Sequence, residues 1–109
     1  MRSEDPEDHY PLYPLGMLRR HGLVGAQDLS QRLPDWTERE LEEWFFPARN
    51  RLRETETDLE SHCSIDGGER VTLFNGHPLF VSCDPWCFEV VAGPELMDQL
   101  VAAMLALRG

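Results

Sequence analysis

The chain has 109 residues, enough for one domain and too few for two. Its 20 acidic and 10 basic residues give a formal net charge of −10, which argues against binding to DNA, RNA or anionic membranes because these are polyanions. The same charge favours fast association with a basic partner. Every basic residue is an arginine, which excludes lysine Schiff-base chemistry and suggests GC-rich coding in a bacterial or phage genome.

The N-terminal residues 1–9 are acidic and contain no apolar stretch. We therefore expect a disordered acidic tail there and no secretory signal, followed by a single α+β domain over residues 10–109. The chain has three cysteines, an odd number for a disulfide framework, and its apolar runs are too short to span a bilayer. These features predict a cytoplasmic protein.

Short helices are expected in the N-terminal part of the domain. The first follows the proline-rich residues 10–15 and ends near Gly22, and the second spans residues 25–33 and ends at Pro34. Both have leucines at spacings that place them on one helical face.

A third helix is expected to begin at Thr37, because Thr37 and Glu40 have the spacing of a capping box. Leu41, Trp44 and Phe45 would form its apolar stripe. Proline lacks the N–H that an inner helical turn needs, so residue 47 should kink or end this helix. Residues 48–60 are then expected to resume it, although 53–60 contain few apolar residues.

From residue 61 onward the sequence alternates with a period of two, which predicts an antiparallel meander of three or four strands. Asn75 and Gly76 are typical of a type I′ turn, which would place Phe74 opposite His77 and fix the register of the hairpin. The same register places Thr72 opposite Leu79 and Val71 opposite Phe80. Both faces of this hairpin are apolar, so we expect helices or a second subunit to cover each face.

Gly93 and Pro94 mark the start of a C-terminal amphipathic helix. Its apolar residues span a broader arc than one packing surface usually needs. The arc fits either a central core helix or a homodimer.

The cysteines and histidines include the residue types of a zinc site, but their expected spacing argues against one. Cys63 is expected on the row of Thr72 and Leu79, about 13 Å along the sheet from Cys83. Whether Cys83 and Cys87 form a disulfide is left open. The chain has no cysteine–histidine dyad within reach and no hydrolase, metalloprotease or phosphate-loop motif. We therefore predict no catalytic residues, no metal and no cofactor.

The candidate binding surface combines carboxylates with aromatic residues. Four glutamates between residues 38 and 43 precede three consecutive aromatic residues, which cannot all face one core because successive helical residues turn by about 100°. Aromatic side chains among charged ones are typical anchors of protein interfaces. The predicted surface comprises Glu38, Glu40, Glu42, Glu43, Trp44, Phe46, Asp84 and Trp86.

These features favour a small acidic inhibitor or adaptor, of the immunity or anti-defence type, that docks on a basic surface of a macromolecular partner. One alternative is a homodimeric structural or assembly module. Another is a winged-helix-like domain. It would serve protein contacts and not DNA binding, because the glutamates on its recognition helix would face DNA phosphates. An enzyme would require a closed polar pocket that holds acidic residues with raised pKa values.

Overall fold

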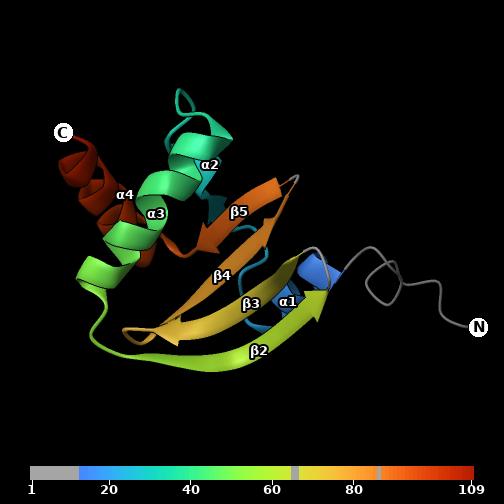
Figure 1. Ribbon diagram of the computed structural model, residues 1–109. Coiled ribbons are helices and arrows are strands. Elements are labelled where there is room, and N and C mark those ends of the chain that lie inside the picture. The colour runs from blue at the N-terminus through green and yellow to red at the C-terminus, as the bar shows by residue number, and fades with distance from the viewer. Residues whose placement is uncertain (1–12, 65–66, 86) are drawn as a thin grey trace, which may run out of the picture.

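Figure 1 shows the computed structural model, which describes residues 13–64, 67–85 and 87–109. These residues form the predicted α+β fold, in which four helices pack on one antiparallel sheet. The predicted tail 1–9 and Trp86 lie outside the described residues.

The sheet has five strands in the order β1-β5-β4-β3-β2, and every neighbouring pair is antiparallel. Strands β2 to β5 form the predicted meander, and a short β1 adds one more strand than expected at the β5 edge. In chain order the elements are α1 (Tyr13–Arg20), β1 (Gln27–Asp28), α2 (Leu29–Arg32), α3 (Glu38–Leu52), β2 (Glu56–Ser64), β3 (Gly67–Phe74), β4 (His77–Asp84), β5 (Cys87–Ala92) and α4 (Pro94–Arg108).

Helix α3 begins as predicted. The Thr37 hydroxyl accepts a hydrogen bond from the Glu40 N–H, and the Glu40 carboxylate accepts one from the Thr37 N–H. The helix continues through Pro47, which lies on its exposed side, where water can solvate the carbonyl left without a donor.

Two expected helices were too long. Residues 48–52 do continue α3, but residues 56–60 belong to β2, because their backbone pairs with β3. The expected helix over residues 25–33 is reduced to α2, because Gln27 and Asp28 pair with β5 as β1 and Gly25 has a positive φ of 86°. Asp28 then caps α2 by accepting a hydrogen bond from the Ser30 N–H.

The β3–β4 hairpin confirms the predicted register. Asn75 and Gly76 have φ values of 49° and 85°, as a type I′ turn requires, and Phe74 pairs with His77. Farther along, Thr72 pairs with Leu79 and Val71 with Phe80.

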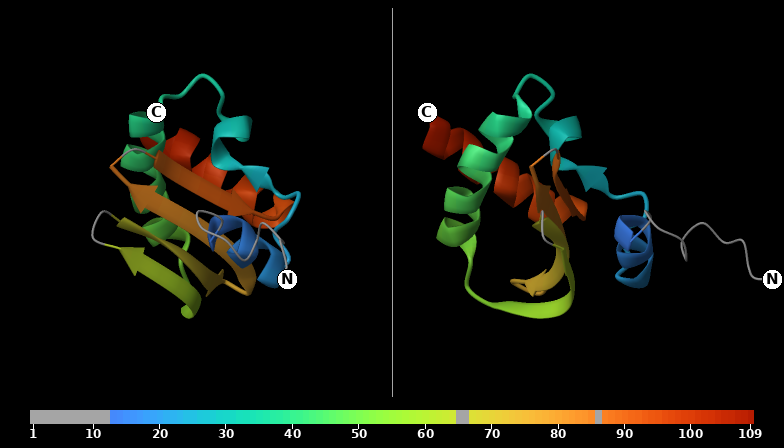
Figure 2. Two further views of the ribbon diagram at one scale, coloured as in Figure 1. Left: turned by 90° about the vertical axis from the view of Figure 1, so that its right-hand side faces the viewer. Right: turned by 45° about the vertical axis from the view of Figure 1, so that its right-hand side comes forward.

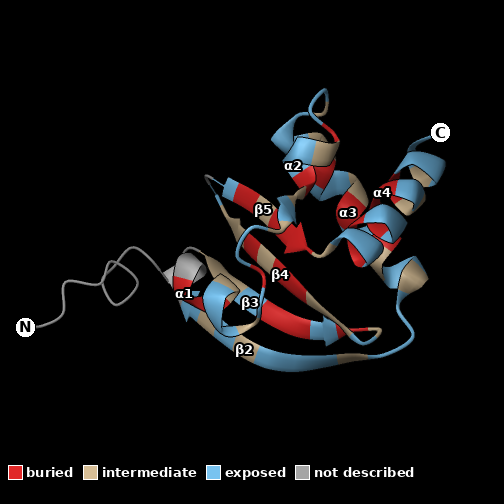
Figure 3. Cartoon of the chain, turned by 180° about the vertical axis from the view of Figure 1, so that it is seen from behind, coloured by how far each residue is buried: buried red, intermediate tan, exposed pale blue. Residues whose placement is uncertain are grey.

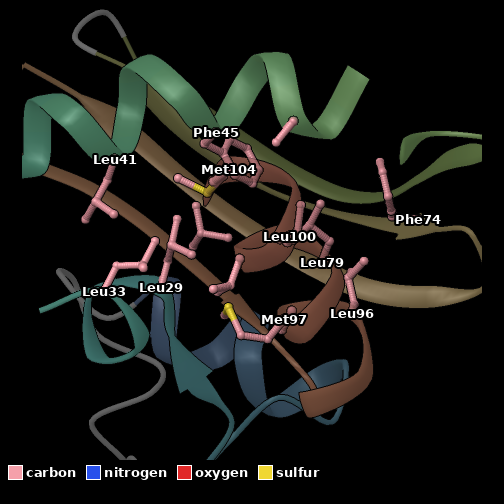
Figure 4. Close-up of a cluster of buried hydrophobic side chains, with 14 of the residues drawn as sticks. Leu29, Leu33, Leu41, Phe45, Phe74, Leu79, Leu96, Met97, Leu100 and Met104 are labelled. Atoms are coloured by element: carbon pink, nitrogen blue, oxygen red, sulfur yellow. The ribbon is translucent and has the colours of Figure 1, made fainter. Parts of the chain in front are cut away.

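Helices cover both faces of the sheet, as its apolar faces predict, and lie on opposite sides of it in Figure 2. On one face, β4, β5 and the end of β3 pack against α2, α3 and α4 (Figure 4). The residues of this main core that Figure 4 labels are Leu29, Leu33, Leu41, Phe45, Phe74, Leu79, Leu96, Met97, Leu100 and Met104. On the other face, Met17 and Leu23 cover a smaller cluster formed by Val71, Phe80 and Val91.

The broad apolar arc of α4 is largely used within the chain. Leu96, Met97, Leu100 and Met104 are fully buried in the main core. Leu105, with 48% of its surface exposed, is the one large apolar side chain of α4 that is exposed. The arc is therefore mainly that of a core helix, and the homodimer stays a prediction.

The helical layer ends before the sheet does. Helices α3 and α4 lie over β5 and β4, and the other edge of the sheet extends beyond them (Figure 2). Strand β2 forms this edge and is exposed along most of its length (Figure 3).

The neighbouring residues Phe45 and Phe46 provide a test of this packing. Phe45 is 0% exposed and Phe46 is 36% exposed. We expect Phe45→Ala to lower the free energy of unfolding by about 3–5 kcal/mol, because it leaves a cavity in the core. Phe46→Ala should cost about 1–2 kcal/mol, because its ring is only partly removed from water. Urea denaturation measures both values, and equal losses would contradict the packing described.

Candidate functional site

Five carboxylates gather where β4 turns into β5, and we call this cluster the acidic end. Asp28, Glu38, Asp84 and Glu89 lie close enough to act electrostatically on the Cys87 thiol. Glu42 and Asp84 act in the same way on the thiol of Cys83. The acidic end therefore comprises Asp28, Glu38, Glu42, Asp84 and Glu89.

Separate elements bring these carboxylates together. Asp28 is the last residue of β1 and the cap of α2, and Glu89 lies in the middle of β5. Glu38 and Glu42 are one helical turn apart at the start of α3, so they share one side of that helix. Asp84 ends β4. The pairing of β1 with β5 is what joins the N-terminal part of the chain to this cluster.

Glu89 has the most strongly shifted pKa at the acidic end. Its partial burial disfavours the charged form, its protonated carboxyl donates a hydrogen bond to Asp28, and the charges of Asp28 and Glu38 add repulsion. Together these effects raise the pKa of Glu89 from 4.5 to about 7. Glu89 therefore exchanges its proton near neutral pH.

No arginine or histidine of the described residues forms an ion pair with Asp28, Glu38, Glu42 or Glu89. Six arginines form ion pairs with other acidic residues instead. The pairs are Arg20–Glu60, Arg32–Asp98, Arg49–Glu56, Arg53–Glu56, Arg70–Asp58 and Arg108–Glu40. The negative charges of these four carboxylates are thus not neutralised by an arginine or histidine of the described residues.

The acidic end borders an open hollow of about 400 Å³ between β5 and the junction of α2 with α3. Asp28, Glu38 and Glu89 lie on its wall together with Trp36 and Phe88. The carboxylates of this hollow offer hydrogen-bond acceptors to a cationic group, and none of the described residues that line it is cationic.

All three cysteines are free thiols. Cys83 pairs with Phe88 and Cys87 with Asp84, so the two cysteines point to opposite faces of the sheet. Burial raises the pKa of both thiols, and the neighbouring carboxylates raise it further. Both therefore stay protonated at neutral pH and are weak nucleophiles.

The expected row of Cys63 was wrong. Cys63 pairs with Gly68, and Gly68 pairs with Cys83, so the two cysteines lie on one row across three strands. Two strand spacings separate them by about 10 Å, which is closer than expected and still too far for a disulfide. The described residues contain no cluster of histidine, cysteine, aspartate or glutamate arranged to hold a metal ion.

A groove of about 270 Å³ lies beside the acidic end, between α3 and the uncovered part of the sheet. Phe46 forms one wall, and Leu79, Val81 and Cys83 of β4 form part of the floor. The Cys83 thiol lies 3.6 Å from the Glu42 carboxylate, so the groove and the acidic end are continuous.

The opposite end of the groove is closed by a charged network. Glu56, whose side chain is 10% exposed, accepts hydrogen bonds from the guanidinium groups of Arg49 and Arg53 and from the Thr72 hydroxyl. Burial alone would raise the pKa of Glu56, but these bonds outweigh it and the pKa is lowered.

The structure separates the residues of the predicted surface. Glu38, Glu42 and Asp84 belong to the acidic end, and Phe46 lines the adjoining groove. The others lie elsewhere: Glu40 pairs with Arg108, Glu43 faces solvent, Trp44 is half-buried against the main core and Trp86 is outside the described residues.

Sequence reasoning missed Asp28 and Glu89 as members of the site, along with Arg70 in the groove. Glu89 had a usable signal, because it is the single charged residue in the apolar strand β5 and must be partly desolvated there. Asp28 and Arg70 had none, because their places depend on strand pairing across the whole domain.

We find no match to this chain among protein-family models, curated proteins or solved structures. None of the described helices combines the length and the apolar character needed to cross a membrane. The function of the protein is therefore inferred from the geometry of the acidic end and its groove.

The raised pKa of Glu89 predicts that stability falls as the pH rises. The folded state holds the proton more tightly than the unfolded state, so the stabilisation is present below pH 4.5 and is lost as the pH rises through about 7. Glu89→Gln keeps the neutral hydrogen bond to Asp28, so this loss should disappear. We expect the variant to exceed the wild type at pH 8 by roughly 1–2 kcal/mol and to match it near pH 4.5.

Urea denaturation from pH 4.5 to 8 measures this effect. The matched control is Glu54→Gln, because Glu54 is an exposed residue between α3 and β2, away from the acidic end. This control should keep the pH dependence of the wild type. A Glu89→Gln variant that is no more stable than the wild type at pH 8 would show that the surroundings of Glu89 do not destabilise its charged form.

Proposed function

We propose that this protein is a small acidic binding module that docks its acidic end on a basic surface of a macromolecular partner. The observation that supports this is that four of its carboxylates, Asp28, Glu38, Glu42 and Glu89, form no ion pair with an arginine or histidine of the described residues, although six arginines neutralise acidic residues elsewhere. The arrangement destabilises the free protein, as the pKa of Glu89 indicates. A basic partner would supply the missing cations.

In mechanism, the negative charge of the acidic end steers the encounter and raises the association rate. Once docked, carboxylates occupy positions that the partner uses for phosphate groups, so binding competes with a polyanionic ligand. This is the action of an inhibitor or adaptor of the immunity or anti-defence type. Free thiols fit the reducing cytoplasm of a bacterial or phage-infected cell.

The carboxyl pair of Glu89 and Asp28 also has the character of an acid–base catalyst, because one of its pKa values lies near 7. The hollow beside the pair is open and lined by carboxylates, and its described lining contains no cationic side chain to stabilise developing negative charge. We therefore favour binding over acyl or phosphoryl transfer.

The test compares two triple variants with equal loss of charge. Glu38→Gln, Glu42→Gln and Glu89→Gln together remove three of the five carboxylates of the acidic end. Glu43→Gln, Glu54→Gln and Glu95→Gln remove the same number of charges from exposed positions outside it. A tagged wild-type protein captures partners from nuclease-treated host lysate at low and high salt, and mass spectrometry identifies them.

We then expect the association rate constant of the captured basic partner to fall steeply with salt concentration and about tenfold or more in the acidic-end variant at pH 8. The control variant should lose at most a few-fold. Surface plasmon resonance measures these rates. Binding that is independent of salt, or equal in the two variants, would refute the proposal.

A further inference from the structure

The groove beside the acidic end exposes an aromatic side chain. Phe46 is the one aromatic residue among the exposed large apolar side chains of the described part of the chain. Its ring packs against Phe45 and Phe88, with centroids 5.1 and 5.8 Å away, and its remaining surface lines the groove. Val81 and Leu79 continue this apolar lining across the floor.

Gly68 leaves space in the floor of the groove because it has no side chain. A Cβ atom at this position would lie 2.6 Å from the His62 carbonyl oxygen and 3.4 Å from the Cys63 sulfur. A larger residue is therefore excluded, and the space above Gly68 between Cys63 and Cys83 stays open.

The volume of the groove limits what it can hold. At about 270 Å³ it is smaller than the roughly 300–1,000 Å³ of sites that enclose drug-sized ligands. It is open along α3, where Glu42 and Arg49 are about two helical turns apart, or about 10 Å. That length matches about three residues of extended chain, and the volume suits one large apolar side chain.

The two ends of the groove carry opposite charges. Glu42 lies at one end beside Cys83, within the acidic end. At the other end Arg49 is held by Glu56, and Arg70 is 53% exposed with its Nε atom 3.9 Å from the Asp58 carboxylate. A bound segment would meet carboxylates at the first end and guanidinium donors suited to its carbonyl oxygens at the second.

We propose that the groove receives one large apolar side chain from an extended segment of the basic partner, next to an arginine or lysine that pairs with Glu42. The occupant follows from charge complementarity with the acidic end and from the continuity of that end with the groove. This inference rests on the proposed function, because the same partner supplies both side chains. The carboxylates attract the segment, and the buried apolar side chain slows its release.

Two synthetic peptides of equal charge test the inference. One has the sequence Gly-Ser-Arg-Phe-Arg-Ser-Gly, and the other has alanine in place of phenylalanine. Each is titrated into isotopically labelled protein at pH 7.5 and low salt, and NMR measures the dissociation constant and maps the shifted residues. We expect the phenylalanine peptide to bind about tenfold or more tightly, with shifts at Phe46 and Val81 that the alanine peptide does not produce.

Phe46→Ala should reduce this advantage to less than about twofold, because it removes one wall of the groove. Leu105→Ala is the matched control, since it removes an exposed apolar side chain from α4 and should keep the full advantage. The mapping with the wild-type protein remains decisive if Phe46→Ala does not fold.

The outcomes separate this inference from the proposed function. If both peptides bind equally and salt weakens both, the groove is not the anchor site and the acidic end alone remains supported. If the phenylalanine peptide is favoured but the acidic-end variant binds it as well as the wild type does, the apolar groove site is supported, whereas the pairing with Glu42 and the proposed function both fail. Shifts that map away from Phe46, or no binding of either peptide at millimolar concentration, would overturn the inference.

Discussion

Glu56 joins helix α3 to the sheet, and the shape of the candidate functional surface depends on this junction. Its nearly buried carboxylate accepts hydrogen bonds from Arg49 and Arg53 on one side and from Thr72 on the other. Asn75 adds a second tie by accepting from the N–H groups of residues 54 and 55 and donating to the Leu52 carbonyl. Helix α3 is thus fixed to β2 and β3 at its C-terminal end. It packs on β5 nearer its start, and the groove is the space left between these two attachments.

The contrast between Glu56 and Glu89 shows what an arginine does for a desolvated carboxylate. Both glutamates are partly buried, yet the pKa of Glu56 is lowered and that of Glu89 is raised. Glu56 has two guanidinium partners, whereas the charged groups that raise the pKa of Glu89 are the carboxylates of Asp28 and Glu38. Arginines thus neutralise Glu56, whereas no arginine of the described residues forms an ion pair with Glu89. A structural role explains the first arrangement, and the proposed docking on a basic partner would account for the second.

Local signals allowed most of the elements to be predicted from the sequence. The capping box at Thr37 and the turn at Asn75 and Gly76 depend on residues within a few positions, and both were found correctly. The β2 strand was placed too late, because residues 56–60 lack an apolar alternation and are strand only through pairing with β3. That error also displaced Cys63 from its true row opposite Gly68. Three of the five residues of the acidic end, Glu38, Glu42 and Asp84, were in the predicted binding surface, but Asp28 reaches them only through the β1–β5 pairing.

The position of Glu42 explains why charge and apolar contact should act together. It belongs to the acidic end by its charge and to the groove by its contact with Cys83, one helical turn before Phe46. A surface of carboxylates alone would attract many basic proteins and hold them weakly, because exposed ion pairs contribute little and are screened by salt. An apolar groove alone would bind without selecting for charge. Since Glu42 lies where the two meet, a partner bound as we propose would gain full affinity only if it presented a cation and a large apolar side chain at the matching distance, and this requirement would provide selectivity that net charge cannot.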